Sequence, residues 1–174
     1  MALDDKLGEL ATGMSVSDAI ESYLARLADV GGGPPVSAAT AARAQSEAIV
    51  EIMFLLAAVD GEVADVELEQ LRKSVRELSG LDVLTGLDAD VLVTTLEGRL
   101  EAEGWSARMH AATDAITAPD ARRLAYRLAA GVAFVDDRVE AAEAVALDSL
   151  GKTFELAPDE SLAILSEVQK TLFG

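Results

Sequence analysis

The chain has 174 residues, of which 51% are hydrophobic but only 4% aromatic, and it contains no cysteine. These proportions exclude a disordered chain and predict a core of aliphatic side chains, while the missing thiols exclude disulfides, thiol catalysis and thiolate metal sites. With 14 basic and 31 acidic residues the net charge is −17. This charge disfavours nucleic acid and anionic membranes as partners and favours metal ions, other cations or basic partners, with simple acidic solubility as the alternative.

Apolar residues recur at spacings of three and four along almost the whole chain, which predicts an all-α fold. Ser17 is a candidate cap for a helix that runs to about Val30, with Ile20, Leu24 and Leu27 on the face expected to dock. Gly31-Gly32-Gly33-Pro34-Pro35 then breaks the chain. We therefore expect residues 1–36 to form an N-terminal helical arm and linker, and residues 37–174 to form a single helical domain.

The domain is expected to be a bundle of about seven helices. Gly61, Gly80 and Gly104 are candidate helix stops, and Pro119 and Pro158 suit the first turns of helices. The predicted helices lie at about 37–59, 68–80, 88–103, 107–116, 119–135, 140–155 and 158–173. The helix at 88–103 is expected to bury Val91, Leu92, Leu96 and Leu100, and Trp105 is expected to be a core anchor at a helix junction.

No membrane or export signal is recognised. The first residues, Met1-Ala2-Leu3-Asp4-Asp5, lack the basic region and the apolar core of a signal peptide. The longest apolar run, from Ile52 to Val59, is far shorter than the roughly 20 residues that span a bilayer. We therefore expect a cytoplasmic protein without a membrane-inserted segment.

One segment of the sequence occurs twice at a constant offset. The first copy is Ala57-Ala58-Val59-Asp60-Gly61-Glu62-Val63-Ala64-Asp65-Val66-Glu67, and the second is Ala133-Phe134-Val135-Asp136-Asp137-Arg138-Val139-Glu140-Ala141-Ala142-Glu143. The apolar identities are what two related helical hairpins, 38–78 and 120–155, need for packing. Packing does not require the acidic identities, Asp60 with Asp136 and Glu67 with Glu143.

Two explanations of these acids are open at this point. Glu67 and Glu143 lie about three residues into their helices. There a glutamate can accept a hydrogen bond from the N-cap amide, and its negative charge interacts favourably with the helix dipole. Asp60 and Asp136 end their incoming helices, where a carboxylate meets the partial negative charge of unpaired carbonyls. Hydrogen bonds to turn amides would offset that conflict, and so would a bound cation.

The repeated pattern of an aspartate, a turn and a glutamate seven residues later resembles the tellurite-resistance TerB family over roughly residues 38–172. The resemblance implies a single all-α domain with pseudo-twofold halves and a cytoplasmic role in metal or chemical stress. It also implies a divalent-metal site formed by Asp60, Glu67, Asp136 and Glu143. The second copy departs from the pattern, because Asp137 stands in the place of Gly61.

Carboxylates without cysteine suit hard cations such as Ca²⁺, Mg²⁺ or Mn²⁺. Gly61 directly after Asp60 does not match an EF-hand loop, and His110, the single histidine, is expected to be an ordinary surface or core-edge residue. We find no nucleophile elbow or phosphate loop. The acidic pattern favours a non-catalytic metal-binding protein, and the resemblance to the TerB family implies that it works with other proteins of a stress response. The main alternative is an acidic protein–protein interaction module without a metal site, and a hydrolase or carboxylate-using metalloenzyme is a more distant one.

Overall fold

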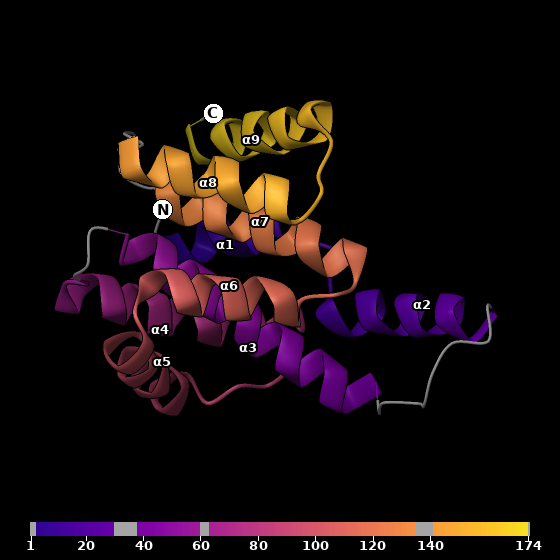
Figure 1. The fold of residues 1–174 in the computed structure, drawn as a ribbon, viewed down its shortest axis with the longest axis horizontal. Coiled ribbons are helices and arrows are strands. Elements are labelled where there is room, and N and C mark those ends of the chain that lie inside the picture. Colours follow the sequence, from indigo (N-terminus) through magenta and orange to yellow (C-terminus); the bar gives the residue numbers. More distant parts are fainter. Residues whose placement is uncertain (1–2, 30–37, 60–62, 135–140, 174) are drawn as a thin grey trace.

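The computed structural model describes residues 3–29, 38–59, 63–134 and 141–173. Over these residues the chain forms helices and no strands, which confirms the predicted all-α class (Figure 1). The described helices are α1 (Leu3–Leu10), α2 (Val16–Asp29), α3 (Ala38–Ala57), α4 (Asp65–Gly80), α5 (Ala89–Glu103), α6 (Trp105–Ala115), α7 (Pro119–Phe134), α8 (Ala141–Thr153) and α9 (Pro158–Phe173). In this described part, none of the helices is both long enough and apolar enough to cross a membrane.

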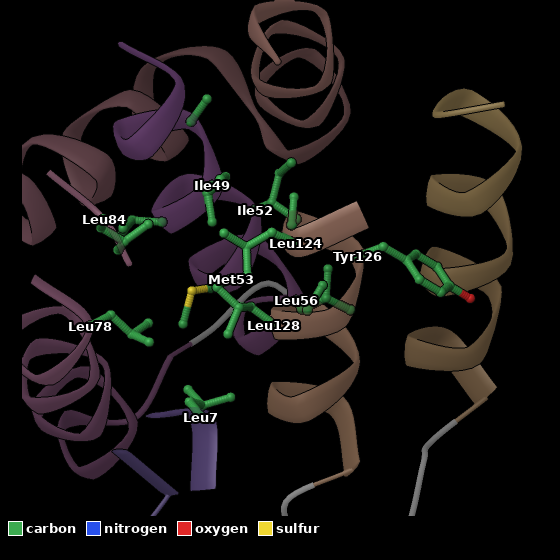
Figure 2. Packing of buried hydrophobic residues seen from close by; sticks show 14 of the residues in the cluster. Leu7, Ile49, Ile52, Met53, Leu56, Leu78, Leu84, Leu124, Tyr126 and Leu128 are labelled. Atoms are coloured by element: carbon green, nitrogen blue, oxygen red, sulfur yellow. The ribbon is translucent and has the colours of Figure 1, made fainter. Parts of the chain in front are cut away.

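Helix α3 is the centre of the fold. Every residue from Ala48 to Leu56 is buried, and α3 contacts α2, α4, α5, α6 and α7. A helix segment that is apolar on almost all sides is stable in water only when other elements surround it, and the neighbouring helices surround this part of α3. Figure 2 shows Ile52 and Met53 of α3 among the side chains of α7, beside Leu124 and Leu128.

Helices α1 and α2, which lie within the predicted arm, contribute to the same core. Leu7 is fully buried between α4 and α7, and Ile20 of α2 is also buried. Gly131 allows this approach, because a Cβ atom there would lie only 2.6 Å from Cδ2 of Leu7. The division into residues 1–36 and 37–174 stays a prediction, but the helices on its two sides share one hydrophobic core.

Several details differ from the sequence-based expectations. Helix α1 was not predicted, and α2 begins at Val16 with the Ser15 hydroxyl, not that of Ser17, accepting from the amide of Asp18 at 3.4 Å. The prediction that Val91 is buried is wrong, because its side chain is 62% exposed and Val93 is buried instead. The run Val91-Leu92-Val93 is apolar at three successive positions, and a helix cannot turn all three towards its neighbours.

Candidate functional site

The structure places two of the four predicted site residues. Glu67 lies in the first turn of α4 and is exposed, and Glu143 lies in the first turn of α8 and is half-buried. Asp60 and Asp136 lie outside the described residues. The structure therefore tests the position of the two glutamates on their helices and leaves the four-residue set as a prediction.

Glu67 and Glu143 occupy equivalent positions relative to a buried leucine of their own helix. Leu71 and Leu147 follow them by four residues, which puts each leucine on the same face as the glutamate before it. Both leucines are buried. Glu67 and Glu143 therefore lie at equivalent places in the first turns of α4 and α8, with Glu67 exposed and Glu143 half-buried.

The two helical pairs turn at the same side of the molecule. Gln45, within the first half of α3, contacts the segment just before α7, since its amide donates to Thr117 Oγ1 at 3.0 Å and its Oε1 accepts from the Thr117 amide at 3.1 Å. From there α3 and α7 pack against each other and both run to the left in Figure 1, where α4 and α8 begin. The described ends that flank the two acidic turns therefore lie on one side of the fold.

A groove lies beside these ends. It is bounded by α6 and α8, has a volume of about 470 Å³, and is lined by Val59, Trp105, Met109, Ala142 and Val145 among others. Val59 directly precedes Asp60, and Ala142 directly precedes Glu143. Val59, next to Asp60, and Ala142, next to Glu143, therefore line the same cavity. We call this cavity the α6–α8 groove.

Within the residues that the structure describes, no three carboxylate, imidazole or thiol side chains come together as metal ligands. The chemistry of the proposed donors fits a hard cation, since all four side chains offer carboxylate oxygens. His110 is exposed and its Nε2 lies 3.3 Å from Asp114 of the same helix, so its predicted place at the surface is confirmed.

A buried ion pair lies nearby and was not foreseen. Glu51 of α3 accepts two hydrogen bonds from Arg108 of α6, both at 2.8 Å, and Arg108 also contacts Glu103 at 3.1 Å. The hydrogen bond to Glu51 raises the pKa of Arg108 above its ordinary value, against the opposing effect of burial. The sequence does carry a signal for this pair, because Glu51 is the one charge inside the apolar run from Ala48 to Leu56.

Trp105 holds the start of α6 next to this pair. Its indole N–H donates to the Leu55 carbonyl at 2.7 Å, and its half-buried ring packs on the core. The prediction of a core anchor at a helix junction is therefore confirmed. Together with Arg108, Trp105 fixes α6 against α3 and so positions one wall of the α6–α8 groove.

Comparison of the chain with protein-family models, with curated proteins and with solved structures finds no match.

Proposed function

We propose that this all-α protein is a non-catalytic binder of divalent cations, with Asp60, Glu67, Asp136 and Glu143 as its ligands. Its role would lie in a cytoplasmic response to metal or chemical stress, as the resemblance to the TerB family implies, together with other proteins of that response. The proposal includes a pseudo-twofold relation between the hairpins 38–78 and 120–155 and a seven-helix domain that begins after the linker.

The observation that carries the proposal is the common direction of α3 and α7. Because α3 and α7 pack against each other and run the same way in Figure 1, the described starts of α4 and α8 lie at one side of the molecule. Val59 and Ala142, which border the two acidic segments, line one groove. Had the two helices run in opposite directions, a site shared by both turns would have no support.

Charge gives the second argument. Each aspartate follows a helix whose last carbonyls carry partial negative charge, and the whole chain carries a net charge of −17. A hard cation would remove this repulsion by using carboxylate oxygens as ligands. Ca²⁺, Mg²⁺ and Mn²⁺ satisfy this chemistry, and Mn²⁺ provides a spectroscopic signal.

One observation favours the alternative function, an interaction module. Val145 is 69% exposed on the wall of the α6–α8 groove, beside the half-buried Met109 and Trp105. An exposed apolar groove on a strongly acidic protein is suited to an amphipathic helix with basic flanks. Under this alternative the repeated acids only fix the turns, and removing them leaves any metal response unchanged.

Thermal melting distinguishes the two functions. Millimolar Ca²⁺ or Mn²⁺ should raise the Tm of the wild type above its value at matched ionic strength, because a ligand at 100 times its Kd adds about 2.7 kcal/mol. The matched control is needed, since screening alone stabilises a chain of this charge. Asp60→Asn with Asp136→Asn should abolish the increment and stabilise the metal-free protein.

The control variant is Glu97→Gln with Glu101→Gln, which removes two exposed charges from α5. It should keep the full metal increment. Equal increments in the wild type and in the Asp60 and Asp136 variant would reject the metal site. Destabilisation of the metal-free protein by the same variant would favour turn stabilisation as the role of the acids.

A further inference from the structure

Helix α8 is attached to the rest of the fold mainly through one neighbour. Among the described helices, α7 is the one with which α8 has more than slight contact, whereas every other described helix packs against at least two. The buried residues of α8 are Ala146, Leu147, Leu150 and Gly151, and the alanine and the glycine have little or no side chain. Two leucines therefore supply most of the apolar burial that holds α8 in place.

Both flanks of α8 border open space. The α6–α8 groove runs along one flank, and a second cavity of about 510 Å³ lies on the other flank, between α8 and α9 (Figure 1). Apolar side chains such as Phe134, Leu147 and Leu165 line this second cavity. A helix with cavities on two sides loses fewer contacts when it moves than a helix packed on all sides. Because α8 is one wall of both cavities, its position also sets the shape of both.

Helix α9 provides an internal reference, because it too packs on α7 but is held by further contacts. Arg123 of α7 lies 3.2 Å from Glu160 of α9. Lys6 of α1 donates to the Leu172 carbonyl of α9 at 2.8 Å, and α1 packs along α9. Helix α9 is therefore fixed to two helices, and its separation from α7 would break more contacts than that of α8.

Glu143 connects α8 with the proposed cation site. It lies in the first turn of α8, whereas Glu67 lies in the first turn of α4. Over the described part of the chain, α4 and α8 have at most slight contact with each other. A cation held by both glutamates would therefore attach α8 to a second part of the fold, and it would bind when α8 is in place on α7.

We propose that α8 opens away from α7 as a separate unit, and that a cation at the repeated acids holds it closed. This inference rests on the proposed function, because Glu143 is one of the proposed ligands. A ligand that binds the closed form alone lowers the open population by a factor of 1 + [L]/Kd, about 100-fold at a concentration of 100 times Kd. Since α8 is a wall of the α6–α8 groove, the ion would thereby regulate the shape of that groove.

Amide hydrogen exchange of the full chain, followed by mass spectrometry of its peptides, tests the opening. Without metal, the amides of α8 should exchange faster than those of α9 and α3, because opening α8 breaks fewer contacts. Peptides from α9 serve as the reference in the same sample. Circular dichroism confirms that every variant compared is folded.

Two leucine-to-alanine variants show whether α8 opens on its own. Leu147→Ala removes a buried side chain of α8 and should speed the exchange of α8 by about 30-fold or more. Leu7→Ala removes a buried side chain of α1, which packs on α4, α7 and α9. It should speed the exchange of α3, which requires global unfolding, and leave the exchange of α8 unchanged.

The cation arm of the experiment uses Ca²⁺ at 100 times the Kd obtained when Ca²⁺ displaces Mn²⁺ in electron paramagnetic resonance. The exchange of α8 should slow by up to about 100-fold, while amides of α9 that exchange through local opening keep their rates. Glu97→Gln with Glu101→Gln should show the same slowing in α8. Asp60→Asn with Asp136→Asn should show none.

The outcomes separate this inference from the proposed function. Bound Mn²⁺ with no slowing of α8 by Ca²⁺ would overturn the inference and leave the proposed function in place. No Mn²⁺ binding would overturn both, and the resonance signal reports that result without reference to α8. The inference is also overturned if metal-free α8 exchanges as slowly as α3, or if Leu7→Ala speeds α8 as much as α3.

Discussion

Arg108 binds the buried carboxylate of Glu51 through two parallel hydrogen bonds, with Nε 2.8 Å from Oε2 and Nη2 2.8 Å from Oε1. Only 3% of the Glu51 side chain is exposed. The fork of the guanidinium matches the carboxylate in shape, which makes this the strongest geometry for such a pair. Arg99 adds a longer contact at 3.7 Å. The pair joins α6 to the central helix α3.

Removing one partner of this pair should destabilise the fold strongly. Arg108→Met leaves the Glu51 charge buried without its main partner and should lower the free energy of unfolding by about 3–5 kcal/mol. The double variant Glu51→Met with Arg108→Met should recover most of the loss, because no buried charge remains. Urea unfolding of the three proteins gives these values.

The exposed pair Arg43–Glu47 is the control, since Arg43→Met should cost less than about 1 kcal/mol. A loss of the same size for Arg43→Met and Arg108→Met would contradict this account of the buried pair.

Replacing each of two helical glycines by alanine should change the stability of the protein in opposite directions. At Gly131 of α7 a Cβ atom would lie 2.6 Å from Leu7 Cδ2 and 3.1 Å from Leu10 Cδ1, so Gly131→Ala should destabilise by about 1–3 kcal/mol. At Gly98 of α5 no atom lies within 4 Å, so Gly98→Ala should stabilise by roughly 0.5–1 kcal/mol through helix propensity. Thermal melting of both variants measures the signs, and stabilisation by Gly131→Ala would refute the close packing of α1 on α7.

The N-terminal helix should prove necessary for stability. Leu7 is fully buried in the shared core, so Leu7→Ala should lower the free energy of unfolding by about 2–5 kcal/mol. Deletion of residues 1–36 should cost at least as much, because it removes several buried side chains together. Glu9→Ala, on the exposed side of α1, should change stability by less than about 0.5 kcal/mol. A deletion variant as stable as the full chain would instead support a dispensable arm.

Tyr126 should make the stability depend on alkaline pH. Burial raises the pKa of Tyr126 above its ordinary value of 10.0, and the negative charge of Asp148 acts in the same direction. The unfolded chain therefore loses this proton first, so the contribution is complete below pH 10 and is lost as the pH rises through the higher pKa of the folded state.

The comparison of wild type with Tyr126→Phe isolates this effect, because the two proteins differ only in the Tyr126 hydroxyl. The difference in unfolding free energy between the two should shrink as the pH rises from 9 to 11. A difference that stays constant over this range would show that the hydroxyl is not buried against α8 and α9.

Helix ends with explicit stop or start signals were predictable from the sequence. Pro119 and Pro158 begin α7 and α9, and Gly104 separates α5 from α6, as their backbone preferences require. Helix α1 was missed, since it has only eight residues and Gly8 interrupts it. Its stability comes from contacts with α4 and α7 that are distant along the chain, and a local pattern contains no information about them.

The candidate sites show the same limit. The repeat placed Glu67 and Glu143 correctly in first turns, because turn and helix patterns are local. Neither cavity beside α8 could be foreseen, since each depends on how α6 packs on α3 and how α8 and α9 pack on α7. The partner of Glu51 was also unforeseen: a charge in an apolar run predicts that a partner exists but does not identify it.

The most direct test of the proposed function is a Mn²⁺ titration followed by electron paramagnetic resonance, in which the signal of free aqueous Mn²⁺ decreases as the ion binds. The wild type should bind one Mn²⁺ per chain, and Ca²⁺ should displace it. Asp60→Asn with Asp136→Asn should lose this site, while Glu97→Gln with Glu101→Gln should keep it at the same affinity. Equal Mn²⁺ binding by all three proteins would contradict a cation site formed by the repeated acids.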